Sequence, residues 1–259
     1  FLFRFRFATE DMLFRLIKED NKIEDMRVRL TKLVKSRIIN RFMLTKVPAG
    51  EIPANALSIY CLDVGGKTLL THYSNEDTTN WYTTVNMKGS EVVSKDLVVG
   101  NFFIKLMETC PHKIKYFKQN PEYRIGRMAI IPSFEMGIIV NGQVRYFIGE
   151  VVRDYDYPMY FRDRLTKIES ILCTNAWKKY YHDTVVPPVL FLLTENDQNA
   201  VDTAGMVAGT SEIKGYRLTT DERLKKELYD AGTFLRLDEE SGKLKGVRTV
   251  IFDPKSDEE

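Results

Sequence analysis

The stretch "IPSFEMGIIVNGQVRYFIGEVV", residues 131–152, decides the fold because it predicts a tight β-hairpin. Asn141-Gly142 stands between two runs of β-branched, aromatic and other apolar residues, and a type I′ turn requires positive φ at both of its central positions. A two-residue turn pairs Val140 with Gln143 and, farther along the two strands, Ser133 with Glu150. The register of this hairpin therefore sets which side chains face one another.

One face of the hairpin carries the outline of a metal-dependent nuclease site. Side chains alternate along a strand, so Ser133, Glu135 and Glu150 share a face. In such a site two carboxylates hold Mg²⁺, and a lysine two residues after the second carboxylate polarises the attacking water. Here Glu150 keeps one carboxylate. Ser133 offers a neutral hydroxyl, which is a poor ligand for a hard cation, and Val152 stands in the position of the lysine.

Two nearby residues are candidates to replace the missing groups. Glu135 lies about 6.6–6.8 Å along the strand from Ser133, so it could share a metal ion with Glu150. Lys167 could supply the lysine from the following helix, but it projects almost opposite to the predicted apolar stripe of that helix. We therefore predict a nuclease-like site without catalysis and without a cofactor. A Mg²⁺-dependent endonuclease that uses Glu135, Glu150 and Lys167 is the alternative.

The amino-terminal residues predict two short helices. Thr9 can cap the first, whose first turn is acidic and favourable at the positive end of the helix dipole. Asn21 and Glu24 can form a capping box that opens a second helix from about Lys22 to Lys35. One side of this second helix is apolar, and the other side and its flanks carry the candidate DNA-binding residues, which are Arg27, Val28, Arg29, Thr31, Lys32 and Lys35.

Two strand-like runs follow, residues 37–47 and 56–64, around a loop that contains proline. Together with the two helices they predict a winged helix-turn-helix whose second helix enters the major groove of double-stranded DNA. An exposed Val28 could contact a thymine methyl group or pack against another subunit. A winged helix that docks only proteins is the alternative. "GGKT" at residues 65–68 lacks the first glycine of a phosphate-binding loop, so we interpret it as a turn.

The rest of the sequence predicts an α/β domain with a central mixed sheet. Residues 74–90 are polar and are interpreted as a linker, and a helix is expected over residues 91–108. "PPVLFLLTEN", residues 187–196, is continuously apolar, as a buried parallel strand would be. The other expected elements are a strand at 112–119, the hairpin, a helix at 159–181, two further helical stretches, and strands at 233–238 and 246–253.

Composition and charge set the class of protein. Residues 1–46 contain 12 Lys/Arg and 6 Asp/Glu, whereas the remaining residues contain 26 and 30, so a basic block precedes a mildly acidic body. Such a block suits a DNA-contacting module. The three cysteines are odd in number and widely spaced, which favours reduced thiols. No apolar run approaches the roughly 20 residues of a membrane helix. We expect a cytoplasmic protein without a membrane partner, α+β overall, with domains at 1–73 and 91–259.

Several segments resemble the replication–relaxation family of plasmids and conjugative elements. The matching residues are "FRFATEDMLFRLI" (5–17), the basic second helix, "SIYCLDVGGKTLL" (58–70), "IPSF…YFIGEVVRD" (131–154), "LTKIESIL" (165–172) and "PPVLFLLTEN". The resemblance implies a winged helix, with its first helix largely before Phe1, followed by a restriction-endonuclease-like domain of the PD-(D/E)xK type. It implies a DNA-binding role in replication or in the relaxosome, with replication or relaxosome proteins, or a second copy of the chain, as partners. A winged-helix transcriptional regulator is the remaining alternative.

Overall fold

The computed structural model describes residues 1–17, 23–44, 56–156, 159–210, 212–213, 215–238 and 241–254, with the side chains of 155 and 210 left out. Contacts divide the chain into two units, Phe1–Ile104 and Lys105–Glu259. The division falls inside helix α5 (Ser90–Thr109), not in the polar segment 74–90. That segment contains buried side chains, Thr78 and Trp81, and belongs to the first unit.

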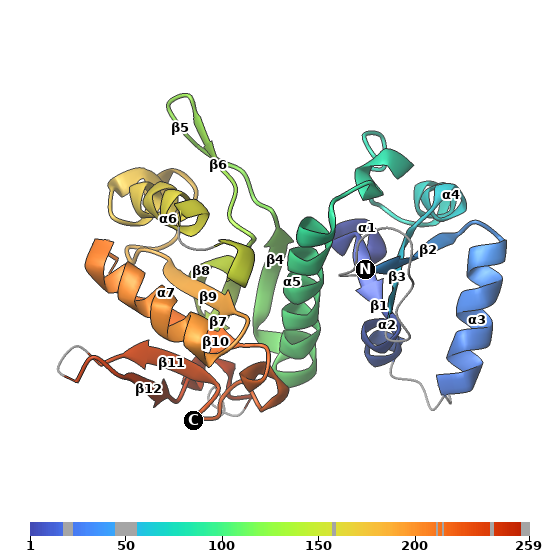
Figure 1. Ribbon diagram of the computed structural model, residues 1–259. Coiled ribbons are helices and arrows are strands. Elements are labelled where there is room, and N and C mark those ends of the chain that lie inside the picture. Colours follow the sequence, from blue (N-terminus) through green and yellow to red (C-terminus); the bar gives the residue numbers. More distant parts are fainter. Residues whose placement is uncertain are drawn as a thin grey trace. The chain divides into compact units, whose positions relative to one another are not determined.

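The first unit has the order of elements of a winged helix-turn-helix (Figure 1). Its three strands form an antiparallel sheet with the order β1-β3-β2. The Thr9 hydroxyl accepts a hydrogen bond from the Met12 amide at 3.2 Å, which is the predicted cap. The elements are α1 (Leu2–Phe5), β1 (Phe7–Thr9), α2 (Glu10–Ile17), α3 (Ile23–Lys35), β2 (Ile39–Leu44), β3 (Leu57–Leu62), α4 (Val64–Tyr73) and the 3₁₀ helix η1 (Thr83–Asn86). Asn21 of the expected capping box and residues 45–55 of the expected wing lie outside the described residues.

The "GGKT" segment starts helix α4, so its interpretation as a turn was wrong. Asp63 caps this helix by accepting a hydrogen bond from the Val64 amide at 2.7 Å. A Cβ atom at Gly65 would lie 2.8 Å from the carbonyl oxygen of Arg37, and one at Gly66 would lie 2.3 Å from that of Ile38. The two glycines are therefore needed for α4 to approach the main chain that follows α3.

The second unit is built on a seven-stranded mixed sheet with the order β12-β11-β10-β9-β8-β7-β4. Strands β8, β9 and β10 are parallel, and β4, β7 and β8 form an antiparallel meander. The α/β class with a central mixed sheet is thus confirmed. The strands are β4 (Ile114–Gln119), β5 (Tyr123–Ile125), β6 (Met128–Ile130), β7 (Phe134–Val140), β8 (Gln143–Val152), β9 (Val189–Thr194), β10 (Tyr216–Thr220), β11 (Phe234–Leu237) and β12 (Leu244–Val247). The helices are η2 (Pro111–Lys113), η3 (Asp154–Asp156), α6 (Met159–Leu172), η4 (Asn175–Lys179), α7 (Asp197–Thr210), η5 (Arg223–Lys225) and η6 (Val250–Phe252).

The β7–β8 hairpin has the register that the Asn-Gly pair predicts. Val140 pairs with Gln143, and Phe134 pairs with Gly149 at the other end. The turn residues have φ values of 50° and 74°, as a type I′ turn requires. The ring of Phe134 lies over Gly149, where a Cβ atom would be 2.0 Å from it. This contact leaves room for no other residue at position 149.

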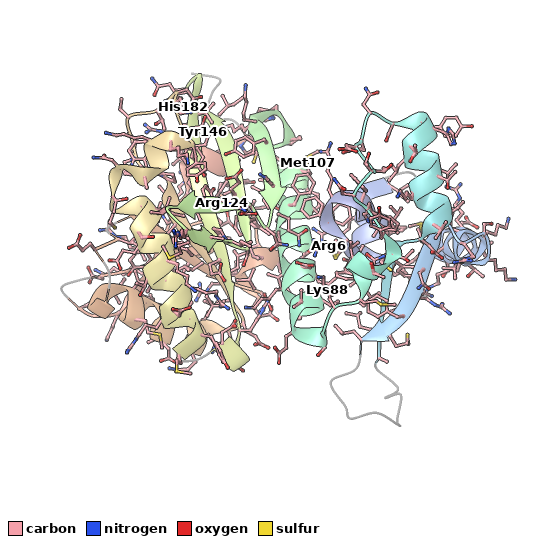
Figure 2. The ribbon with its side chains drawn as sticks, turned by 90° about the horizontal axis from the view of Figure 1, so that it is seen from above. Arg6, Lys88, Met107, Arg124, Tyr146 and His182 are labelled. Carbon is pink, nitrogen blue, oxygen red and sulfur yellow. The ribbon has the colours of Figure 1, made fainter. Side chains whose placement is uncertain are left out.

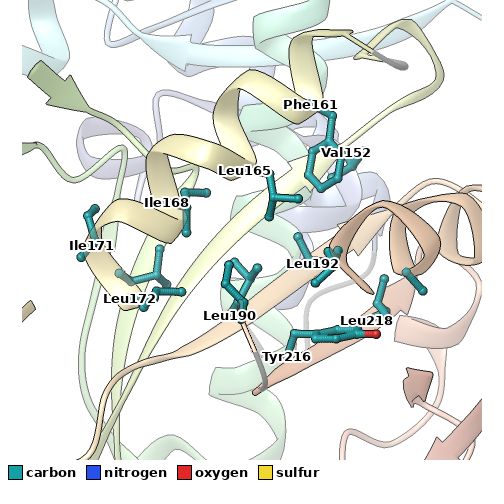
Figure 3. Packing of buried hydrophobic residues seen from close by; sticks show 14 of the residues in the cluster. Val152, Phe161, Leu165, Ile168, Ile171, Leu172, Leu190, Leu192, Tyr216 and Leu218 are labelled. Carbon is teal, nitrogen blue, oxygen red and sulfur yellow. The ribbon is translucent and has the colours of Figure 1, made fainter. Parts of the chain in front are cut away.

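Helix α6 covers the sheet with the predicted apolar stripe (Figure 3). Phe161, Leu165 and Ile168 are buried in one cluster with Leu190 and Leu192 of β9. The predicted helix 159–181 was too long, because α6 ends at Leu172. A hydrogen bond to the Thr174 hydroxyl from the Ala176 amide at 3.2 Å then opens the separate helix η4. None of the described helices is long and apolar enough to cross a bilayer.

The expected last strand, 246–253, is only partly a strand. Strand β12 ends at Val247, and the chain turns through η6 so that Phe252 is fully buried. Its ring lies 5.9 Å from that of Phe191 and 5.5 Å from that of Phe234, measured between centroids. After Val247 the chain therefore stops pairing with β11 and instead packs the ring of Phe252 against those of Phe191 and Phe234.

Candidate functional site

Helix α3 has an apolar inner face and a basic outer face. Met26 and Leu30 are buried in a cluster with Ile39 and Tyr60. On the other side Val28 is 55% exposed, and Lys32 is exposed one turn farther along the helix. A surface hollow of ≈ 320 Å³ lies over this outer face, and the described residues that line it are Arg27, Val28, Thr31, Lys32 and Lys35. Five of the six residues predicted to contact DNA thus border one hollow.

The basic residues of this face differ in their partners. The Arg27 guanidinium pairs with Glu10 of α2, with Nε and Oε1 2.7 Å apart, and this hydrogen bond raises the pKa of Arg27. Arg27 therefore also ties α3 to α2, a role that the sequence did not predict. Within the described residues neither Lys32 nor Lys35 forms an ion pair. Arg29 is exposed beside them.

In the second unit the hairpin brings Ser133 and Glu150 together as the sequence predicts. The Glu150 side chain is buried, and its Oε2 accepts a hydrogen bond from the Ser133 amide at 3.2 Å. The Ser133 hydroxyl accepts a hydrogen bond from the Val151 amide at 3.0 Å. Ser133 therefore joins the two strands at the point where a nuclease would carry its second carboxylate.

A residue that sequence reasoning missed, Arg164 of α6, neutralises this centre. Its Nε lies 2.7 Å from Oε1 of Glu150, and its Nη1 lies 3.0 Å from Oδ1 of Asp156. Both carboxylates are almost fully buried, and a buried charge is stable only when it is paired. The guanidinium thus bridges two acids, as a divalent cation does in a nuclease. The available signal was its spacing, because Arg164 lies three residues after Phe161 and four before Ile168 on the edge of the buried stripe.

Glu135 has different partners from Glu150. Its carboxylate accepts a hydrogen bond from the Tyr123 hydroxyl and another, at 3.1 Å, from the Tyr181 hydroxyl. Burial raises the pKa of both tyrosines, so both stay protonated and act as donors. Diagonal neighbours on paired strands are about 7–8 Å apart, and here each acid is held by its own set of partners. Among the described residues, Glu135 and Glu150 are therefore not part of one set of metal ligands.

The two positions considered for the lysine also have other roles. Val152 is fully buried in the cluster that contains Phe161 (Figure 3). Lys167 lies on the exposed side of α6, where its Nζ is 2.7 Å from Oδ2 of Asp163. Among the described residues no group of three or more His, Cys, Asp or Glu side chains is arranged to hold a metal ion. The ion pairs of Arg164 with Glu150 and Asp156 can bind α6 to the sheet, and the guanidinium of Arg164 provides the positive charge that a metal ion would provide in a nuclease.

No model of a known protein family matches this sequence, and no curated protein matches it. Among solved structures the chain is similar to one described as protein VC1899 from Vibrio cholerae, with 13% identity and a TM-score of 0.30. The match covers 80% of this chain and 41% of that protein's chain. None of these comparisons assigns a function to the chain.

Proposed function

We propose that this protein binds double-stranded DNA through the outer face of α3, and that its second unit is a nuclease-like scaffold without nuclease chemistry. The observation that carries the proposal is the pair of exposed lysines, Lys32 and Lys35, beside Val28 at the hollow on α3. As the resemblance of several segments to the replication–relaxation family implies, the DNA would be a site on a plasmid or conjugative element, used in replication or transfer.

The shape and the charge of α3 together favour DNA as its ligand. The major groove of B-DNA is wide enough for one α-helix, and phosphate contacts by lysine and arginine provide most of the sequence-independent affinity. Met26 and Leu30 fix the rotation of α3, so the opposite face points away from the core of the first unit. The Arg27–Glu10 pair fixes α3 against α2, which lowers the cost of ordering the helix on binding.

The partners of Glu150 disfavour metal-dependent catalysis. A metal ion at this carboxylate would have to displace the guanidinium of Arg164, and Asp156 would lose the same partner. Ser133 and Val152 supply neither a second acid nor a lysine, as the sequence alone already indicates. The second unit then serves as a scaffold that holds partner proteins, a second copy of the chain, or more DNA.

Binding to a labelled duplex, measured by fluorescence anisotropy over a range of salt concentrations, tests the DNA-binding part. Each phosphate contact contributes about 0.9 to the slope of log K against log salt, so Lys32→Ala with Lys35→Ala should reduce the slope by up to about 1.8. Lys243→Ala with Lys245→Ala removes the same formal charge next to or within β12, where Lys245 is paired with Asp238, and serves as the charge-matched control. An unchanged slope in the α3 variant, or equal losses in both variants, would remove α3 from the interface.

The location of the DNA site on the element distinguishes a role in replication or transfer from a role in transcription. Footprinting on the element that encodes the protein should show protection near an origin of replication or of transfer. Protection confined to a promoter would instead favour the transcriptional regulator.

A further inference from the structure

Strands β5 and β6 form a two-stranded ribbon that extends from the second unit beside α6 (Figure 1). They pair antiparallel over three residues each, from Tyr123 opposite Ile130 to Ile125 opposite Met128. Gly126 in the turn has a φ of 59°, which glycine adopts readily. Isolated hairpins are at best marginally stable in water, so the ribbon needs support from the rest of the unit.

That support is a set of tyrosines at the base of the ribbon. Tyr123 is 1% exposed, and its hydroxyl lies 2.5 Å from that of Tyr181 and also contacts Glu135. The Tyr180 hydroxyl accepts a hydrogen bond from the Arg124 amide at 2.6 Å and donates one to the Arg124 carbonyl at 3.0 Å. Both main-chain groups of Arg124 are thereby fixed, so the ribbon is held in one direction.

The supported ribbon presents positive charge. The Arg124 side chain, labelled in Figure 2, is 72% exposed, and its Nε lies 2.5 Å from Oε1 of Glu122, just before β5. Arg127 in the turn is exposed and forms no ion pair with a described residue. Tyr180 places Lys178 and Lys179 of η4 next to the ribbon, and each ammonium group lies over a neighbouring ring, at 5.6 Å from Trp177 and 5.7 Å from Tyr180. The ribbon and the segment around η4, residues 120–131 and 175–183, contain four Lys/Arg and two Asp/Glu. The whole second unit contains 23 Lys/Arg and 24 Asp/Glu, so this region is more basic than the rest of the unit.

We propose that the β5–β6 ribbon is a second DNA-contacting element, independent of α3, that places Arg124 and Arg127 against the phosphates of a DNA duplex. The major groove of B-DNA admits a two-stranded β-ribbon, whereas the major groove of A-form RNA is too deep and narrow for side chains to read. Arginine forms bidentate contacts with phosphate, and a ribbon that is already fixed loses little entropy on binding. The proposal shares the ligand of the proposed function and uses different residues.

The test is the salt dependence of duplex binding by the full chain. Arg124→Ala with Arg127→Ala should reduce the slope by about 0.9 if Arg127 alone contacts phosphate, and by about 1.8 if Arg124 leaves Glu122 to make a second contact. Arg124→Lys with Arg127→Lys should largely restore the slope. The pair Lys243→Ala and Lys245→Ala again serves as the charge-matched control. Circular dichroism of each variant verifies the fold. A slope equal to that of the unmodified protein would overturn the proposal.

A photo-crosslinking amino acid at position 128, at the exposed side of the ribbon, gives a readout that charge alone does not move. Met128 is 37% exposed and next to Arg127, so a crosslink to duplex DNA is expected from this position and not from position 243. A crosslink only to a duplex RNA of the same sequence, or only to protein, would overturn the assignment to DNA.

The two proposals fail separately. If the ribbon variants bind like the unmodified protein while the α3 variants are weakened, the ribbon proposal is wrong and α3 remains the interface. If only the ribbon variants are weakened, α3 is not the interface and the second unit binds the DNA. If the unmodified protein binds no duplex, both proposals are wrong.

Discussion

The pairing of buried Glu150 with Arg164 gives the sharpest test of the proposed scaffold, because the charge of Arg164 can be removed by substitution with a side chain that is no larger. Arg164→Met keeps most of the aliphatic length and removes the guanidinium that bridges Glu150 and Asp156. Breaking a buried ion pair by removing one partner costs roughly 3–5 kcal/mol. Because the Arg164 side chain is 27% exposed, water can reach the vacated space, and we expect a loss at the lower end, about 3 kcal/mol of unfolding free energy.

The protein offers a fluorescent reporter in each unit for this measurement. It contains two tryptophans, and both are buried, Trp81 in the first unit and Trp177 in the second. In a Trp81→Phe background, urea unfolding followed by fluorescence reports the second unit alone. Lys167→Met on the same helix is the matched control, since its exposed i,i+4 pair with Asp163 is worth only about 0.3–0.5 kcal/mol.

A double-mutant cycle separates the ion pair from general damage to α6. Glu150→Gln in the Arg164→Met background removes one of the two acids left without their cation, so the double variant should be more stable than Arg164→Met alone. Contacting charges typically show coupling energies of about 0.5–3 kcal/mol. A loss below about 0.5 kcal/mol in Arg164→Met, which is the range of ordinary surface substitutions, would refute the reasoning. Zero coupling with Glu150 would do the same.

Three further predictions test the centre, the thiols and the packing of α4. Supercoiled plasmid should remain intact with the protein and Mg²⁺ or Mn²⁺, and metal-dependent nicking that Glu150→Gln abolishes would contradict the proposed absence of catalysis. Burial raises the pKa of Cys61 to about 11, so a thiol reagent at pH 8 should modify exposed Cys173 well before Cys61. Equal labelling rates of the two thiols would contradict the burial of Cys61. Because the Cys61 thiol is neutral when protonated and its pKa is raised in the folded protein, its contribution to stability is complete below about pH 8.5 and is lost as the pH rises toward 11. Gly66→Ala should lower the unfolding free energy by about 1–3 kcal/mol, because its Cβ would lie 2.3 Å from a carbonyl oxygen, whereas Gly89→Ala, which meets no atom within 4 Å, is the control.

The features that the sequence predicts correctly are those that depend on neighbours along the chain. The Asn141-Gly142 turn fixes the pairing of Val140 with Gln143 through local φ values, and every later pair of the hairpin follows from it. The exposed position of Lys32 follows from helical spacing in the same way. Both predictions use residues within a few positions of one another, where backbone geometry alone is enough.

The features that the sequence missed depend on contacts between distant segments. Glu150 meets Arg164 because α6 crosses the sheet at a particular rotation, and Glu135 meets Tyr181 from a segment 46 residues away. The β5–β6 ribbon was missed because its strands are only three residues long, too short for a periodic pattern. No local rule of spacing specifies such partners, so pattern reasoning predicts where an acid lies and not what neutralises it.

Internal pairing separates the charges of this protein into two kinds. A cation that already has a carboxylate partner gains little from a phosphate unless it leaves that partner, and the cost of leaving rises with burial. Arg164 is paired with two buried acids, so its charge stabilises the fold and is not available to DNA. Arg27 is paired with one partly exposed acid, so it can contact DNA at a smaller cost. Lys32 and Lys35 form no ion pair with any described residue, so they can release counterions from DNA without losing an internal contact. The same reasoning ranks the two arginines of the ribbon. Arg127 has no ion pair among the described side chains and is the better candidate for a phosphate contact, whereas the Nε of Arg124 is already paired with Glu122.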